Sequence, residues 1–174
     1  MSGGARESST SELERVLAID TATSGGSIAL RVRGESRERA LEWRGSFRQA
    51  APAVDELLAE AGLLLGQLDA IAVPSGPGSF TGLRVGAALA LGLARVARVP
   101  LSAVPTLAAV AEAFAPPGPA RACATLDARR GRRYAALYER ERPGLWRLVA
   151  GPVDGTPPEV AALAAGAPVV GPDP

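Results

Sequence analysis

Two short stretches of this chain carry residue types that could hold a metal ion or a phosphate. The first, Asp20-Thr21-Ala22-Thr23, follows an apolar run. Its carboxylate could orient a metal-bound water, and a tight turn would aim backbone amides at an anion. The second, residues 76–82, precedes a helical pattern whose N-terminal amides would favour anions. The candidate phosphate-type residues are Asp20, Thr21, Thr23, Gly76, Gly78 and Ser79.

Both loops also have a structural interpretation, which we favour. A phosphate-cradling loop needs a lysine after its glycines, and the chain contains no lysine. The glycines instead permit a sharp strand-to-helix turn, with Ser79 as the helix N-cap and Phe80 packing the loop down. Asp20 would then cap its own turn through the amide of Thr23. We therefore expect no cofactor to be bound by this chain.

The residue types that are missing exclude several mechanisms. All 19 basic residues are arginine, and the chain contains no histidine. It therefore has no imidazole base, no Schiff-base amine and no histidine metal ligand. Its one cysteine, Cys123, sits in an apolar run and is expected to be a buried hydrophobic residue. We expect no catalytic residues and no metal site.

A cluster of arginines crowds an expected hairpin tip around Gly131. Such a cluster could hold RNA phosphates, although charge runs at turns are usually only solvated, and the net charge of the chain is only +1. Tyr134 and Tyr138, which follow, are expected to pack in a sheet rather than to stack on bases. The candidate contact residues are Arg129, Arg130, Arg132 and Arg133.

The stretch from Ser79 to Ala94 is predicted to be a helix without a charged face, because its only charged side chain is Arg84. Small residues recur every fourth position and would let another backbone approach closely. The chain itself could cover that side, but we favour a partner protein. Arg84 could pair with Asp20, with a helix end or with a partner carboxylate, which we favour. The predicted partner interface is Phe80, Gly82, Leu83, Arg84, Gly86, Ala87, Ala90 and Ala94.

A membrane span is the third reading of this helix, and we reject it, because the apolar run is shorter than the ~20 residues of a bilayer crossing. The first 14 residues are expected to be a disordered leader, and they lack the apolar core of a signal peptide. We therefore expect a cytoplasmic protein.

The elements that must position these residues follow from hydrophobic periodicity and turn signals. The sequence contains no convincing internal repeat. The domains are expected to be a leader over 1–14, a first lobe over 15–115, a linker over 116–120 and a second lobe over 121–174. The first lobe is predicted to contain strands at 15–20, 27–33, 39–43, 68–74 and 101–104, a helix from Ser46, the apolar helix, and a helix capped by Thr106. The second is predicted to contain strands at 121–127, 134–139, 145–149 and 169–170, with a helix opened by Thr156.

This order resembles the α/β fold of actin, hexokinase and Hsp70 (the ASKHA, ribonuclease H-like fold), with a mixed sheet, flanking helices and a smaller, incomplete second lobe. More closely, three motifs resemble the TsaB (YeaZ) family of bacterial tRNA-modification proteins. They are Leu17-Ala18-Ile19-Asp20-Thr21-Ala22-Thr23, Gly76-Pro77-Gly78-Ser79-Phe80-Thr81-Gly82-Leu83-Arg84-Val85-Gly86 and Asp127-Ala128-Arg129-Arg130-Gly131-Arg132-Arg133-Tyr134.

The resemblance implies a non-catalytic subunit that pairs with the catalytic subunit TsaD through the first-lobe helices. With the ATPase TsaE, the pair would support threonylcarbamoyl transfer to N6 of adenosine 37 in tRNAs that read ANN codons. It also implies indirect contact with tRNA, a homodimer when the chain is alone, and ATP and Mg²⁺ held by the partner subunits. The alternative is a stand-alone ATPase or small kinase of the actin-like fold.

Three features depart from these patterns. ATP-using members of the fold place a glycine where this chain has Ala22, so the site resembles a degenerate one. Members of the TsaB family commonly run tens of residues further, and many carry a histidine where this chain has Ser46-Phe47-Arg48-Gln49. Neither family departure touches the predicted pairing helix.

Overall fold

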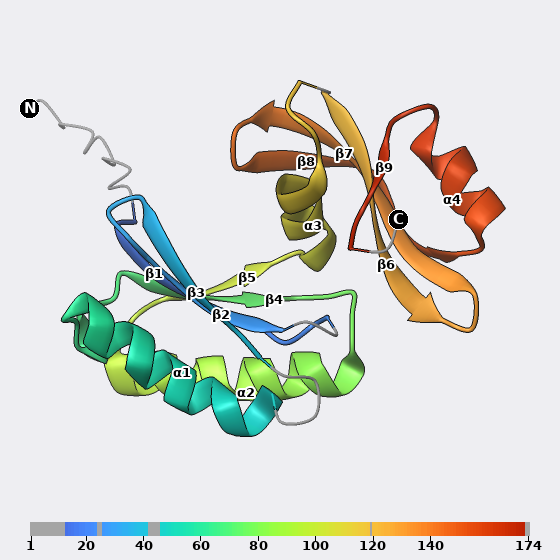
Figure 1. Ribbon diagram of the computed structural model, residues 1–174. Helices are drawn as coiled ribbons and strands as arrows, with labels where there is room; N and C mark the ends of the chain where they lie inside the picture. The colour runs from blue at the N-terminus through green and yellow to red at the C-terminus, as the bar shows by residue number, and fades with distance from the viewer. Residues whose placement is uncertain (1–12, 24–25, 42–45, 119, 173–174) are drawn as a thin grey trace, which may run out of the picture.

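The computed structural model describes residues 13–23, 26–41, 46–118 and 120–172, which form two α/β lobes (Figure 1). The first lobe contains a five-stranded mixed sheet with the strand order β3-β2-β1-β4-β5. The first three strands form the predicted antiparallel meander, and β4 and β5 run parallel to β1. The strands are β1 (Arg15–Asp20), β2 (Ser27–Val32), β3 (Glu35–Ala40), β4 (Ala70–Pro74) and β5 (Leu101–Val104).

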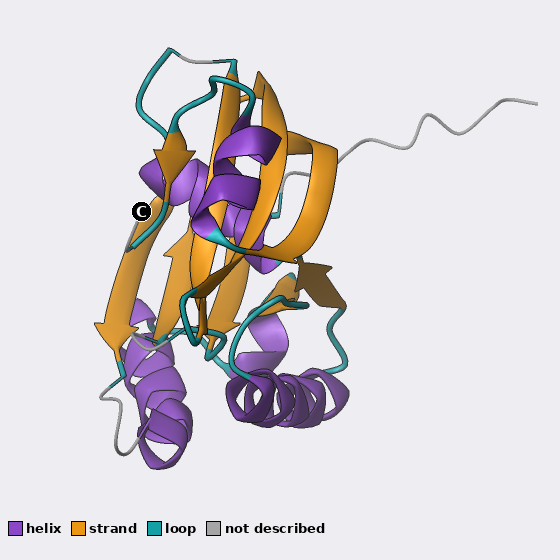
Figure 2. Cartoon of the chain, turned by 90° about the vertical axis from the view of Figure 1, so that its right-hand side faces the viewer, coloured by secondary structure: helices purple, strands orange, loops and turns teal. Residues whose placement is uncertain are grey.

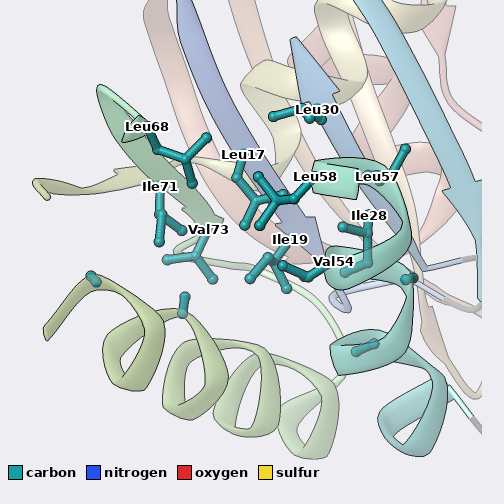
Figure 3. Close-up of a cluster of buried hydrophobic side chains, with 14 of the residues drawn as sticks. Leu17, Ile19, Ile28, Leu30, Val54, Leu57, Leu58, Leu68, Ile71 and Val73 are labelled. Carbon is teal, nitrogen blue, oxygen red and sulfur yellow. The ribbon is translucent and has the colours of Figure 1, made fainter. Parts of the chain in front are cut away.

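Helices α1 (Ser46–Ala61) and α2 (Phe80–Ala97) lie side by side on one face of this sheet (Figures 1 and 2). The alternation of side chains along β1 sends Leu17 and Ile19 into the core, where both are fully buried. Figure 3 shows this core, in which aliphatic side chains of the strands meet those of α1. A short 3-10 turn, η1 (Leu65–Gln67), leads from α1 towards β4.

The second lobe contains a four-stranded sheet with the order β8-β7-β6-β9. The helix α3 (Thr106–Phe114) packs on one face through Leu107, Val110 and Ala111, and α4 (Pro157–Ala164) packs on the other. Helix α3 was predicted to belong to the first lobe, 15–115. Its buried side chains pack instead in the core of the second sheet. The strands are β6 (Arg121–Arg129), β7 (Arg132–Arg142), β8 (Leu145–Gly155) and β9 (Val169–Val170).

The two lobes repeat one topology that the sequence does not reveal. In each lobe a three-stranded antiparallel meander is followed by a helix and then by a strand parallel to the first. The sheet orders β3-β2-β1-β4 and β8-β7-β6-β9 therefore correspond strand by strand. Because β1 and β4 are parallel neighbours, the loop after β1 lies beside the loop that leads from β4 into α2, where the candidate residues lie.

Some element boundaries differ from the sequence predictions. The third strand, Glu35–Ala40, begins before the predicted 39–43, because Arg33 and Gly34, with φ values of 48° and 90°, form a tight turn directly before it. Positions 42 and 43 of that prediction lie outside the described residues. Its side chains are mostly charged and exposed, as edge strands often are, so apolar periodicity placed it wrongly. The strands β7 and β8, with 11 residues each, are also longer than predicted.

The inner side of α2 packs closely against the segment that follows β1. The hydroxyl of Thr21 donates a hydrogen bond to the carbonyl of Gly82 at 2.8 Å. A Cβ atom at Gly82 would lie 1.8 Å from the carbonyl oxygen of Thr21, and one at Gly86 would lie 2.1 Å from its hydroxyl oxygen. Ala90 and Ala94 continue this side and are buried. The small residues are therefore required by a close approach within the chain.

We expect Gly82→Ala to lower the free energy of unfolding by about 1–3 kcal/mol, because the new methyl group has no space beside Thr21. Gly92→Ala is the matched control, since a Cβ there meets no atom within 4 Å. It should stabilise the helix by about 0.5–1 kcal/mol. Thermal unfolding of both variants measures the difference. Equal effects at the two glycines would contradict the packing described for Gly82.

Candidate functional site

The outer face of α2 presents large apolar side chains to solvent. Phe80 is 74% exposed, Leu91 is 51% exposed and Val96 is 80% exposed. Ala87 and Ala88 lie between them and are also exposed. We define the outer face of α2 as Phe80, Arg84, Ala87, Ala88, Leu91, Arg95 and Val96. Several exposed large apolar side chains on a helix that already covers a sheet are typical of an interaction site.

The structure corrects half of the predicted partner interface. The buried residues of α2 are Gly82, Gly86, Ala90 and Ala94, so they face the chain's own sheet and cannot meet a partner. Leu83 is half-buried, and the other three predicted residues, Phe80, Arg84 and Ala87, are exposed. Ala88, Leu91 and Val96 were not predicted, although Ala88 lies opposite the small residues on a helical wheel, which would have indicated it.

Arg84 lies over the ring of Phe80, with its guanidinium carbon 5.3 Å from the ring centroid. Phe80 therefore does not pack the glycine loop down, as predicted, but extends into solvent with Arg84 stacked on it. Within the part of the chain that the structure describes, Arg84 makes no ion pair with Asp20 or any other acid. The cation remains available to an external carboxylate.

Helix α2 is also the one described helix that is long and apolar enough, at 18 residues, to cross a membrane by length and composition alone. In the structure its inner side packs on the sheet, and its outer face carries Arg84 and Arg95. In the structure 22% of this helix is buried, and its buried residues include Ala90 and Ala94, which pack in the core of the first lobe.

The two candidate phosphate loops meet, but their polar groups mainly satisfy each other. The amide of Ser79 donates to the carbonyl of Ala22 at 2.7 Å. Gly78 lies so close to Ala22 that a Cβ would be 2.6 Å from its carbonyl oxygen. Ser79 caps α2 as predicted, its hydroxyl accepting from the amide of Gly82. The glycines therefore serve close loop packing, which is the structural interpretation favoured above.

Asp20 caps its own turn through an amide, but the amide belongs to Ala22 rather than to Thr23. Its Oδ1 atom accepts this bond at 2.7 Å. Burial raises the pKa of the Asp20 carboxyl, the amide of Ala22 opposes the shift, and the charge of Glu38 adds to it. Asp20 is therefore a carboxylate whose charge the described structure compensates poorly.

A cleft of about 630 Å³ separates the open face of the first sheet from α3, which lies opposite α1 and α2 (Figure 1). The described residues that line it include the acids Asp20 and Glu38 and no basic residue. The hydroxyl of Thr106 is buried beside it without a hydrogen-bond partner, because Pro105 and not Thr106 is the N-cap of α3. Acidic walls oppose the binding of a polyphosphate.

The arginine hairpin forms the predicted β6–β7 turn, but its four side chains differ in availability. Arg132 pairs with Asp154 at 2.7 Å, and Arg133 donates to the hydroxyl of Thr125 at 3.2 Å. Arg129 and Arg130 are exposed at the tip, with φ values of 69° and 55°. Tyr138 is buried in the second core, as predicted for a sheet residue, and Tyr134 packs against it.

The cysteine and the acidic side chains are the remaining candidates for chemistry among the described residues. Cys123 is fully buried, and burial raises the pKa of its thiol, so it is not poised as a nucleophile. Among the described residues, no group of three or more acidic or cysteine side chains is placed to hold a metal ion. The outer face of α2 is therefore the strongest candidate site.

Two mixed sheets of matching topology, joined through α3 and enclosing a cleft, define the actin-like (ASKHA) class of α/β proteins. A family model described as TsaD, tRNA N6-adenosine threonylcarbamoyltransferase, matches residues 44–154. Within this class the chain belongs to the TsaB (YeaZ) family, as the relatives below show.

Two curated relatives bear the name tRNA threonylcarbamoyladenosine biosynthesis protein TsaB. The protein of Escherichia coli is 40% identical over 134 residues, and that of Haemophilus influenzae is 42% identical over 129 residues. These matches cover 76% and 73% of this chain but 58% and 55% of the relatives, so the chain spans little more than half of their length. The solved structure of YeaZ from Pseudomonas aeruginosa is 35% identical with a TM-score of 0.75, covering 83% of this chain and 68% of that one.

The pKa shift of Asp20 predicts a pH-dependent effect on stability. Because the native pKa is raised, ionisation penalises the folded state, and this penalty appears as pH rises through the native pKa. Asp20→Asn keeps an acceptor for the Ala22 amide and should stabilise the protein at about pH 7, with the gain vanishing near about pH 3. Urea unfolding at both pH values measures the gain.

Asp69→Asn is a control that should change stability at neutral pH in the opposite direction. Arg15 lowers the pKa of the Asp69 carboxyl through hydrogen bonding, so its stabilisation is present above the unfolded pKa and is lost as pH falls. This variant should be destabilised at neutral pH, with a smaller difference in acid. A loss of stability in Asp20→Asn at neutral pH would contradict the description of Asp20 as an uncompensated buried charge.

Proposed function

We propose that this chain is a non-catalytic, cytoplasmic partner subunit in tRNA threonylcarbamoyladenosine biosynthesis. It would pair with the TsaD subunit and, with the ATPase TsaE, support transfer of a threonylcarbamoyl group to N6 of adenosine 37 in tRNAs that read ANN codons. Membership of the TsaB family and the name of the curated relatives support the pathway. The exposed apolar strip on α2 supports the role as a binding subunit.

The outer face of α2 is the observation that carries this proposal. Its inner side is already used to cover the sheet, so the exposed Phe80, Leu91 and Val96 contribute nothing to the described core. Leaving such side chains in water has a cost that a complementary partner removes on binding. A partner of the same fold would offer an equivalent helical layer, and two such layers could pack as a four-helix interface.

The chemistry of the reaction falls to the partner subunits in this proposal. The chain has no histidine or lysine to act as a base or nucleophile, and its cysteine is buried. ATP and Mg²⁺ would be held by TsaD and TsaE, which agrees with the acidic lining of the cleft. The alternative of a stand-alone ATPase or small kinase gains no specific support from the described residues.

Substitution of Leu91 by aspartate should abolish pairing with TsaD or weaken it at least about tenfold, because it places a charge in the centre of an apolar interface. The monomer should remain folded, since Leu91 points to solvent. Leu148→Asp is the matched control, because Leu148 is 45% exposed on the second lobe. Calorimetric titration of each variant with TsaD measures the affinity, and unchanged binding by Leu91→Asp would reject this interface.

Any contact of this chain with tRNA would come from the tip of the β6–β7 hairpin. It would contribute less to tRNA binding than the contacts made by the partner subunits. Arg129 and Arg130 are the exposed arginines whose side chains are free of the bonds seen at Arg132 and Arg133. Replacing both with alanine should weaken tRNA binding by the assembled complex. A plot of the logarithm of the binding constant against the logarithm of the salt concentration should become less steep, by about one unit of slope for each lost phosphate contact. Filter binding at several salt concentrations tests this, and an unchanged slope would show that the tip is only solvated.

A further inference from the structure

The outer face of α2 carries charge of one sign only. Its charged residues are Arg84 and Arg95, and the helix contains no acid. The two arginines lie about three turns apart, so they project from the same side of the helix, roughly 16 Å apart along its axis. Ala88 and Leu91 lie between them and are exposed. The face is therefore an apolar strip with a cation towards each end.

This arrangement disfavours pairing with a second copy. If two copies of α2 align antiparallel about the middle of the helix, Arg84 of one lies within about 3 Å, along the axis, of Arg95 of the other, and symmetry creates this contact twice. If they align in parallel, each arginine meets its own equivalent. In both arrangements like charges are brought together at the edge of an apolar contact, where they are screened less than in open solvent.

We propose that the two arginines select a different protein over a second copy of this chain. The selected partner presents a helix whose apolar strip lies between two carboxylates, spaced roughly 16 Å apart to meet Arg84 and Arg95. The inference rests on the pairing through α2 proposed above and adds the charge pattern of the partner. Stacking on Phe80 holds the Arg84 guanidinium over the strip and ready for a planar carboxylate.

The acids of the neighbouring helix α1 provide the main competing arrangement. Glu56 and Glu60 are engaged by Arg39 of β3, but Asp55 is exposed and forms no ion pair with any of the described residues. A second copy that offered Asp55 to Arg84 would be held by attraction. The two arrangements respond oppositely to salt, because screening weakens an attractive contact and relieves a repulsive one.

Self-association of the isolated chain is the first test. Sedimentation velocity should show a dimer that strengthens several-fold between about 50 mM and about 500 mM salt, as repulsion is screened. Arg84→Gln/Arg95→Gln should dimerise more tightly than the parent at low salt. Self-association that weakens with salt, or is unchanged by the glutamine substitutions, would overturn the proposal.

A charge-swap mixture is the second test and needs no other protein. Arg84→Glu/Arg95→Glu carries the same like-charge repulsion with the opposite sign, so it should self-associate no more tightly than the unaltered chain. Its equimolar mixture with the unaltered chain should dimerise at least about tenfold more tightly than either chain alone. Circular dichroism confirms that the variant is folded. Arg130→Glu, which alters an exposed arginine of the second lobe, should not complement the unaltered chain in this way. A mixture no tighter than its components would also overturn the proposal.

Titration with TsaD separates this inference from the proposed function. Binding of the unaltered chain that falls with salt and is lost in the double glutamate variant supports both. If binding to TsaD depends on Leu91 but is unchanged by salt and by substitution of both arginines, the proposed function is supported and the charge selection is rejected. If TsaD does not bind at all, the proposed function fails, whereas the charge-swap mixture still decides whether the arginines repel a second copy.

Discussion

The close approach of α2 to the segment after β1 is the contact on which the rest of the structure depends. Thr21 reaches the carbonyl of Gly82, and neither Gly82 nor Gly86 leaves room for a Cβ beside it. This contact fixes which side of α2 faces inward. Because the fully buried positions of α2 are small residues, the helix lies close to the sheet, while Phe80, Leu91 and Val96 are left exposed. The exposed strip is thus a consequence of how the core is packed.

The same contact accounts for the state of the two candidate phosphate loops. Loops that bind phosphate must keep their amides free and aimed at the ligand. Here the amide of Ser79 is bonded to Ala22, and the amide of Ala22 is bonded to Asp20. The fold therefore retains the loop positions of an actin-like protein while using their hydrogen bonds for packing.

Much of the fold could be predicted from the sequence, because the strands and helices that build the core follow clear periodicities. The strand β1, the helix α2 and the N-cap at Ser79 lie where the residues indicated. The edge strand β3 was misplaced because its exposed, charged side chains give no apolar pattern. The interaction of α3 with the second sheet and the repeat of the two lobes depend on contacts distant in sequence, which a local pattern does not contain.

The exposed apolar side chains lie on the helix that was predicted to be apolar on all sides, but half of the predicted partner residues lie on its buried side. Small residues four positions apart indicate a close approach, but they do not indicate whether the approaching backbone belongs to the same chain. The close contacts of Thr21 with Gly82 and Gly86 show that the approaching backbone belongs to the same chain. Likewise, Phe80 was expected to close its loop, but the loop is closed by main-chain bonds, which leaves the ring free to stack under Arg84.

Hydrogen–deuterium exchange of the chain with and without TsaD tests the central claim most directly. The account predicts that TsaD slows exchange in α2, Phe80–Ala97, and in the adjacent α1, while the strands of the second lobe are unchanged. Protection confined to the second lobe or to the cleft beside α3, with exchange in α2 unaltered by bound TsaD, would contradict it.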